Sequence, residues 1–157
     1  MENGWEITQI NPRQHGGPNG RIRKVLETIS LICAEKQPEI RNFHIAAAIV
    51  DTDRDILSIG FPRSKSHPIQ KRFGNNAHSI YLHAEIDAVV RMLRKYPIDA
   101  RKHSLYIVRV KNISASNFEY GIAIPCKGCM EFITHTGLRR IVTVMPQSLL
   151  YEITRKF

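Results

Sequence analysis

Helix and strand patterns alternate through the second half of the chain, and this alternation restricts the possible folds more than any other feature of the sequence. Helical periodicity covers 83–96 and 126–136, and runs rich in β-branched residues cover 104–110 and 141–145. Strands separated by helices form a sheet with a parallel portion, and the helices cover its faces. We therefore expect an α/β fold, a three-layer α/β/α domain with a mixed central sheet.

The first half of the chain supplies the remaining elements of this domain. Residues 21–36 have the apolar spacing of an amphipathic helix, and 44–51 and 56–61 predict an antiparallel hairpin of two strands. Residues 1–19 contain Gly, Pro and Asn and predict an irregular arm. Because 157 residues is the length of one ordinary domain, we expect a single domain over 20–157.

Two segments between these elements have no regular pattern. Residues 62–76 predict a polar, basic loop, and residues 111–121 predict an irregular insertion. We expect the insertion, centred on 112–120, to form part of a pocket wall or an oligomer contact.

Two short motifs, each at the start of a predicted helix, contain residue types that bind zinc. They are His83-Ala84-Glu85 and Pro125-Cys126-Lys127-Gly128-Cys129. One histidine and two cysteines leave the fourth position of a tetrahedral zinc ion free for water, as in catalytic sites. Cys126 and Cys129 share the first helical turn, where the helix dipole lowers a thiol pKa. We therefore predict that His83, Cys126 and Cys129 bind Zn²⁺, whereas Cys33 fills the core.

Glu85 is the predicted catalytic residue. Side chains at the start of a helix lean back toward its N-terminus, so His83 and Glu85 can reach the same cavity. Zinc lowers the pKa of a water to near neutrality, and the resulting hydroxide attacks an electron-poor ring carbon. A carboxylate at Glu85 would carry protons to the ring nitrogen and then to the departing ammonia. Asp87, two residues on, is expected to be a solvated helix residue.

The two motifs, in this order, form the known signature of zinc-dependent base deaminases. On these residues the chain resembles the cytidine and deoxycytidylate deaminase superfamily, from the hairpin at 44–61 through the strand at 141–145. The runs 64–68 and 80–88 look similar to small phage-type deoxycytidylate deaminases. The resemblance implies a core sheet, two helices that converge on zinc, backbone groups near Ala84 and Pro125 that bind the base, and a homo-oligomer.

The resemblance also implies an activity, the hydrolytic deamination of a cytosine nucleotide, with dCMP converted to dUMP and ammonia. In deoxycytidylate deaminases an Asn after the second strand binds the sugar hydroxyl. Here Gly60-Phe61 is followed by Pro62, which has no such donor. Sugar recognition by that route is therefore not expected.

A basic segment precedes the zinc-binding helix. Residues 62–73 include Arg63, Lys65, Lys71 and Arg72 and no acidic residue. Cations in this position could bind the phosphate of a nucleotide, and Arg63 and Lys65 are the predicted contacts. The alternative is a solvated loop with no ligand.

Other functions stay open at this stage. A net charge of +9 and a pI of about 9.8 favour polyanions, so the substrate could instead be a base in single-stranded DNA or RNA. A purine is a further alternative, because purine deaminases share the motif. Outside enzymes, the cysteines could form a redox pair, or His67 or His78 could complete a catalytically silent zinc-binding module.

The sequence also bears on the cellular compartment and on membrane association. The longest apolar run, Ile45–Val50, is too short to cross a bilayer. The N-terminal residues lack the pattern of a secretory signal, and paired cysteines in a reducing compartment favour metal chemistry. We expect a cytoplasmic protein without a membrane span.

Overall fold

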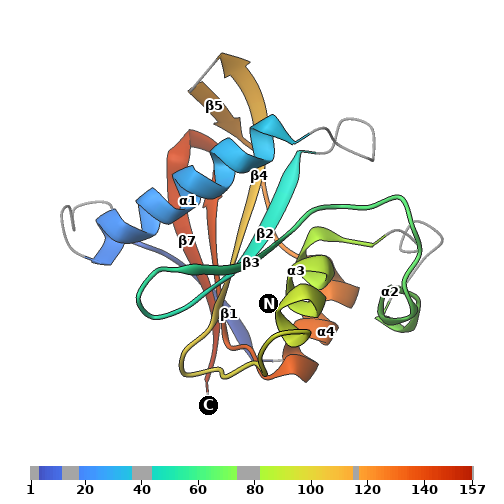
Figure 1. The fold of residues 1–157 in the computed structure, drawn as a ribbon. Coiled ribbons are helices and arrows are strands. Elements are labelled where there is room, and N and C mark those ends of the chain that lie inside the picture. The colour runs from blue at the N-terminus through green and yellow to red at the C-terminus, as the bar shows by residue number, and fades with distance from the viewer. Residues whose placement is uncertain (1–3, 12–17, 37–43, 74–81, 115–116, 157) are drawn as a thin grey trace.

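The structure is a computed structural model that describes residues 4–11, 18–36, 44–73, 82–114 and 117–156 (Figure 1). Its strands are β1 (Trp5–Gln9), β2 (Ile45–Val50), β3 (Ile56–Gly60), β4 (Ser104–Ser114), β5 (Asn117–Tyr120), β6 (Arg140–Met145) and β7 (Leu149–Arg155). Its helices are α1 (Pro18–Glu35), α2 (Pro68–Phe73), α3 (Ala84–Leu93) and α4 (Lys127–Thr136), with a 3₁₀ turn at Pro146–Ser148. None of the described helices is long and apolar enough to span a membrane.

The strands form one seven-stranded mixed sheet. Its order is β1-β7-β6-β4-β2-β3, and β5 pairs with β4 outside this path. Strands β4 and β6 run parallel, whereas β2 pairs antiparallel with both β3 and β4. The mixed sheet with a parallel portion, expected from the alternation of elements, is confirmed.

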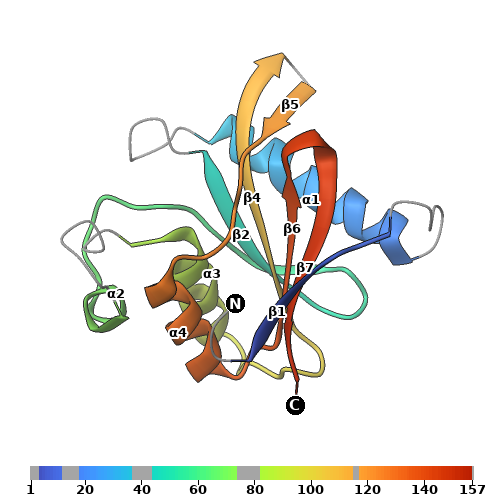
Figure 2. The ribbon, with the colours of Figure 1, turned by 180° about the vertical axis from the view of Figure 1, so that it is seen from behind.

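Helices cover both faces of the sheet. Helix α1 lies across one face, and α3 and α4 lie side by side on the other (Figures 1 and 2). Successive side chains of β4 point to opposite faces of the sheet, so both faces need cover. Tyr106 and Val108 belong to the core under α1, while Leu105 and Ile107 belong to the core under α3 and α4. The three-layer α/β/α architecture is therefore confirmed.

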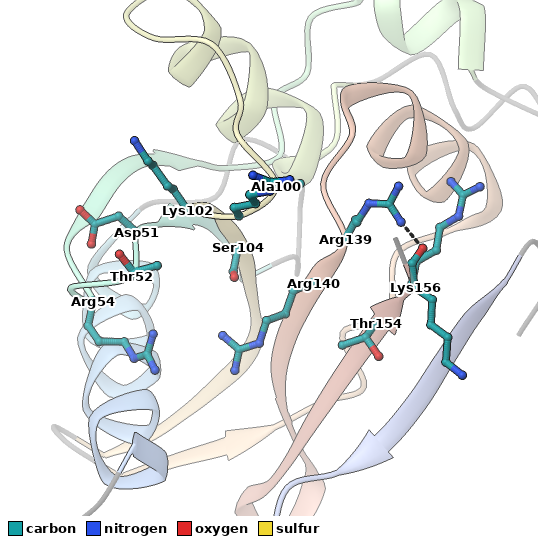
Figure 3. Close-up of a pocket in the computed structure, with 12 residues that line it drawn as sticks. Asp51, Thr52, Arg54, Ala100, Lys102, Ser104, Arg139, Arg140, Thr154 and Lys156 are labelled. Carbon is teal, nitrogen blue, oxygen red and sulfur yellow. Dashed lines mark hydrogen bonds between the residues drawn. The ribbon is translucent and has the colours of Figure 1, made fainter.

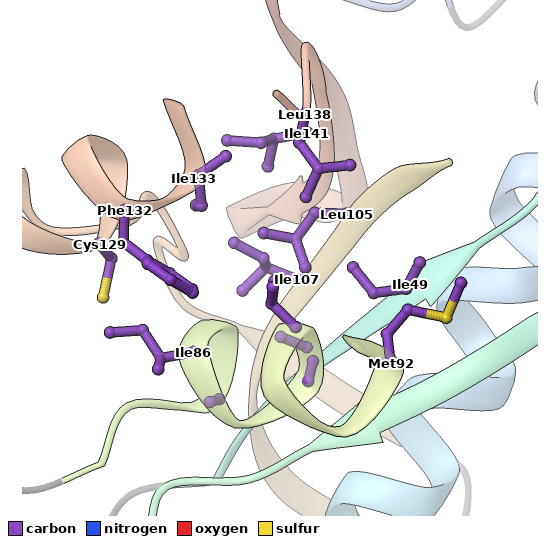
Figure 4. Close-up of a cluster of buried hydrophobic side chains, with 14 of the residues drawn as sticks. Ile49, Ile86, Met92, Leu105, Ile107, Cys129, Phe132, Ile133, Leu138 and Ile141 are labelled. Carbon is purple, nitrogen blue, oxygen red and sulfur yellow. The ribbon is translucent and has the colours of Figure 1, made fainter. Parts of the chain in front are cut away.

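The core under α3 and α4 holds these two helices in place. Ile86 from α3 and Ile133 from α4 are fully buried against Ile107 of β4 (Figure 4). Each buried side chain of this size contributes about 1.5–3 kcal/mol relative to an exposed one. The starts of α3 and α4 are thereby fixed to a rigid sheet.

Helix α3 also approaches β3 very closely, at a glycine. A Cβ atom on Gly60 would lie 2.3 Å from the backbone N of Ala88 and 2.5 Å from the backbone O of Ala84. The Ser58 hydroxyl donates a hydrogen bond to the Ala88 carbonyl, at 2.8 Å. Only glycine permits this contact between strand and helix backbones.

We expect Gly60→Ala to lower the free energy of unfolding by about 3 kcal/mol, since α3 must move away from the sheet. Gly20→Ala is the matched control, because a Cβ atom at Gly20 meets nothing within 4 Å and alanine favours the helix by about 1 kcal/mol. Urea denaturation of both variants tests this expectation. Equal stability of the two variants would contradict it.

The described part of the predicted irregular arm at 1–19 contains regular structure, contrary to the sequence prediction. Trp5–Gln9 forms β1, which pairs antiparallel with β7 at the edge of the sheet. The Trp5 side chain is 2% exposed, and its indole N–H donates a hydrogen bond to the Thr134 hydroxyl at 3.0 Å. Burial of a large aromatic ring, together with pairing to a strand distant in sequence, orders this segment.

Two other segments predicted as irregular contain regular structure. Within 111–121, β4 continues to Ser114 and β5 returns as the second strand of a hairpin. Within 62–76, Pro68–Phe73 forms the short helix α2. Segment 111–121 lacks a clear period-2 alternation and α2 has only six residues, so neither element gives the periodicity from which strands and helices are predicted.

Candidate functional site

The predicted zinc ligands lie at the starts of two adjacent helices. His83 is the N-cap residue of α3, and Cys126 is the N-cap residue of α4, with Cys129 in its first turn. Neither N-cap side chain makes a capping hydrogen bond, so His83 and Cys126 keep their donor atoms for another partner. Both helices direct their positive dipole ends at this point, which favours anionic ligands.

The three donor atoms have the spacing that zinc requires. His83 Nδ1 lies 3.6 Å from Cys126 Sγ and 3.2 Å from Cys129 Sγ. A tetrahedral zinc with Zn–N near 2.05 Å and Zn–S near 2.3 Å needs N···S separations of about 3.6 Å. The ligand atoms of all three residues lie within 4.8 Å of one another. One nitrogen and two sulfur donors therefore fit a zinc ion with one open position, and Zn²⁺ is the cofactor of this site.

The two cysteines differ in acidity. A hydrogen bond from Cys129, aided by His83 and the Cys129 backbone, lowers the pKa of the Cys126 thiol to about 4. The same hydrogen bond and burial raise the pKa of the Cys129 thiol. Cys126 is thus a thiolate before metal binds, and ligation by Cys129 must release a proton.

Glu85 lies beside the ligands and away from water. Its side chain is 8% exposed, and its Oε2 accepts a hydrogen bond from Cys129 Sγ at 3.7 Å. Burial raises the pKa of the Glu85 carboxyl. A carboxyl group with a raised pKa beside a metal site is suited to accept and return protons near neutral pH.

Gln70 is part of the site and was not identified from the sequence. It lies on α2, is fully buried, and its Oε1 accepts a hydrogen bond from the His83 backbone N–H at 3.1 Å. Its Nε2 group is buried and has no hydrogen-bond partner among the described residues. Gln70 therefore holds the residue that begins α3 and presents an unsatisfied donor next to it. Its position within a basic, polar run gave no signal for this role.

Asp87 is buried, and the prediction of a solvated helix residue was wrong. It is 5% exposed, and its Oδ2 accepts hydrogen bonds from the Phe61 backbone N–H, Arg63 Nε and Arg91 Nε, at 3.1, 3.2 and 3.1 Å. Ion pairing with two arginines offsets the cost of burying the carboxylate. Asp87 thus ties the segment after β3 to α3.

The other candidate substrate contacts lie around the ligands. Ala84 and Pro125, each adjacent to a ligand in sequence, are buried. Arg63 N–H donates to the Leu82 carbonyl at 2.9 Å and Leu82 N–H donates to the Lys65 carbonyl at 3.2 Å, so the basic segment runs beside the residue that precedes His83. Lys65 has an exposed side chain, and the Arg63 side chain is paired with Asp87.

Of the two alternative zinc ligands, His67 lies within the described residues and is not part of the metal-binding group. His67 Nδ1 accepts a hydrogen bond from the Ile69 backbone N–H at 3.2 Å, at the start of α2. His78 lies outside the described residues. Among the described residues, the group that could hold a metal consists of His83, Cys126 and Cys129.

Comparisons with known proteins agree with this site. Residues 21–145 match the model of the cytidine and deoxycytidylate deaminase zinc-binding region. Among solved structures, cytidine deaminase from Burkholderia pseudomallei is similar, with a TM-score of 0.54 and 18% sequence identity over 84% of this chain and 91% of that one. The search of curated protein sequences gave no match. Because the family match covers both zinc-binding motifs and well over half of the sequence, the chain belongs to the cytidine and deoxycytidylate deaminase family of zinc-binding proteins.

Proposed function

We propose that this protein hydrolytically deaminates a cytosine nucleotide, with dCMP as substrate and dUMP and ammonia as products. The observation that carries the proposal is the buried Glu85 carboxyl, 3.7 Å from Cys129 Sγ at a three-ligand metal site. A site with three protein ligands keeps a position for water, whereas a structural site is closed by four. A silent zinc-binding module would have no need of a buried acid with a raised pKa at this point.

Glu85 is proposed to move the protons. Zinc, when bound, supplies a Lewis acid that lowers the pKa of a water molecule. Glu85 takes one proton from the attacking water and gives it to the ring nitrogen as the new C–O bond forms. It then takes the second proton from that oxygen and gives it to the amino group, so that the C–N bond breaks and ammonia leaves. The raised pKa of Glu85 suits both directions of transfer.

Residues around the ligands are proposed to hold the nucleotide. Backbone groups at Ala84 and Pro125 would bind the base, and the exposed Lys65 would contact the phosphate. Pro62 offers no hydrogen-bond donor to the sugar, so phosphate contacts supply the selectivity. Arg63 also forms an ion pair with Asp87, so its substitution would disturb that contact as well. Lys65 is therefore the better position for a test.

Ammonia release from zinc-loaded protein tests this proposal, with deoxycytidine, dCMP, dCTP, purine nucleotides and cytosine-containing oligonucleotides as substrates. We expect dCMP to exceed deoxycytidine in kcat/KM. Lys65→Ala should lower kcat/KM for dCMP by roughly ten- to a hundredfold, the value of one charge-assisted hydrogen bond, and leave deoxycytidine unchanged. Lys111→Ala, which removes an exposed lysine from β4, is the matched control and should behave as wild type.

Other outcomes of this panel contradict the proposal in different ways. Salt-sensitive activity confined to oligonucleotides would assign the protein to polynucleotide deamination. Turnover of purines alone would overturn the choice of base. Absence of ammonia from every substrate would favour the silent module.

Assembly and location complete the proposal. We infer a homo-oligomer, and the exposed apolar side chains of Ile122 (60%) and Ile124 (41%), which lie just before the cysteine motif, support it. We also infer a cytoplasmic location, because the zinc-binding thiols must remain reduced.

A further inference from the structure

A basic pocket lies beyond the ends of α3 and α4 that are opposite the metal ligands. It has a volume of about 370 Å³ and is lined by Asp51, Thr52 and Arg54 after β2, Ala100, Arg101 and Lys102 before β4, Ser104 at its start, Arg139 and Arg140 at β6, and Thr154, Arg155 and Lys156 at the end of β7 (Figure 3). The ligands His83 and Cys126 cap the N-termini of these helices. A helix of ten residues is about 15 Å long, so the basic pocket is a separate site.

Charge in the basic pocket is strongly one-sided. Seven of its lining residues are Arg or Lys, and Asp51 is the acidic one. The Asp51 carboxylate already accepts hydrogen bonds from the backbone N–H groups of Asp53 and Asp55, each at 2.9 Å. Arg54 and Arg140 point toward one another across the pocket (Figure 3), and Arg140 Nε also forms an ion pair with the Glu152 carboxylate. An anion between them could accept hydrogen bonds from both guanidinium groups.

Arg54 shows two further signs that it serves a ligand. Its Nε atom is buried and has no hydrogen-bond partner in the described structure, a state that costs free energy unless an acceptor enters. Its backbone has φ = 67°, a left-handed conformation that favours glycine or asparagine in a turn. An arginine in this conformation has backbone strain that glycine would not have, and it places a guanidinium group in the pocket.

We propose that the basic pocket binds the phosphate groups of a small di- or triphosphate, of the nucleotide class. Arginines bind phosphate oxygens through paired hydrogen bonds, and several surrounding cations match more than one phosphate group. The buried Arg54 Nε requires a hydrogen-bond acceptor that reaches into the basic pocket. The flexible end of a small molecule can reach this atom. This proposal does not depend on which base the metal site deaminates.

Inorganic pyrophosphate is the probe, titrated calorimetrically into zinc-loaded protein with zinc content checked afterwards. We expect binding at one site per chain. Arg54→Gly should weaken it by about ten- to a hundredfold while the fold is retained, because glycine suits φ = 67°. Lys102→Gln should weaken it less, since an exposed cation contributes less. Lys24→Gln removes one charge from the exposed face of α1 and should leave the affinity unchanged.

Three results would overturn the proposal. The first is pyrophosphate affinity that is the same in Arg54→Gly as in wild type. The second is affinity lost in Lys65→Ala but kept in Arg54→Gly, which would place the anion at the metal site. The third is binding of single-stranded oligonucleotide by the Arg54 pocket without binding of pyrophosphate. Failure of the proposed deaminase activity would change none of these readouts, so the two proposals fail separately.

Discussion

Cys126→Ser is expected to lose zinc and to lose deaminase activity to below detection. The serine hydroxyl stays protonated at neutral pH, whereas the Cys126 thiol has its pKa lowered to about 4 by Cys129 and His83. Loss of a residue that merely supports a ligand already lowers metal affinity by about ten- to a hundredfold, and loss of a ligand must exceed that. Elemental analysis of dialysed protein measures the stoichiometry.

The third cysteine provides the matched control. Cys33 lies in the core under α1 and is not part of the metal-binding group. Burial raises its pKa to about 12, so it is a neutral thiol that only fills space. Cys33→Ala should therefore keep one zinc per chain and its activity. Stoichiometric zinc in Cys126→Ser would remove the basis for the metal site.

Zinc affinity should also depend on pH in a defined direction. The pKa of His83 is raised, chiefly by its hydrogen bond to Cys126, and the pKa of Cys129 is raised by its hydrogen bond to Cys126 and by burial. Each must lose its proton before it can bind metal. Affinity therefore falls as the pH is lowered, and proton release on zinc binding is detectable in weakly buffered solution.

The metal site was predictable because its residues are close together in sequence and lie at helix starts. His83 and Glu85 are two residues apart, and Cys126 and Cys129 are three apart. Spacing this short fixes the relative positions of side chains in a first helical turn. The family signature then pairs the two motifs, which no local pattern could do.

Residues that depend on distant partners were not predictable. Asp87 has the position of an exposed acid in a helix, with Arg91 four residues further along α3, but Phe61 and Arg63 meet it only after β3 has packed against α3. Gln70 contacts His83 from a six-residue helix without apolar periodicity. Burial of such polar groups follows from tertiary contacts that satisfy their hydrogen bonds.

The helices and strands that were predicted have a local sequence pattern, whereas those that were missed depend on distant partners. Helices α3 and α4 have apolar residues at helical spacing, and α4 is followed by its C-cap residue Gly137 with φ = 88°, a common helix end. Strands β1 and β7 pair with each other and form one edge region of the sheet. Their sequences are partly polar because one side faces solvent, so their order depends on pairing more than on pattern.

Glu85→Gln is expected to keep its fold and its zinc and to lose at least about a hundredfold in turnover, the lower end for general acid–base catalysis. The amide has nearly the shape of the carboxyl but cannot take a proton from water. Glu27→Gln, on the exposed face of α1, is the matched control and should turn over at the wild-type rate. Single-turnover kinetics with saturating substrate and measured zinc content separates loss of chemistry from loss of metal.

A stability measurement checks the same residue independently of activity. Burial raises the pKa of Glu85 above its ordinary value of 4.5, so the folded state binds the proton more tightly than the unfolded state does. The contribution of Glu85 to the stability of the metal-free wild type must then fall as the pH rises above about 4.5, until the folded carboxyl has ionised. Glu85→Gln has no such ionisation, and its advantage in melting temperature should grow over that range. Parallel melting curves at all pH values, or wild-type turnover by this variant, would reduce Glu85 to a favourable charge at the start of a helix.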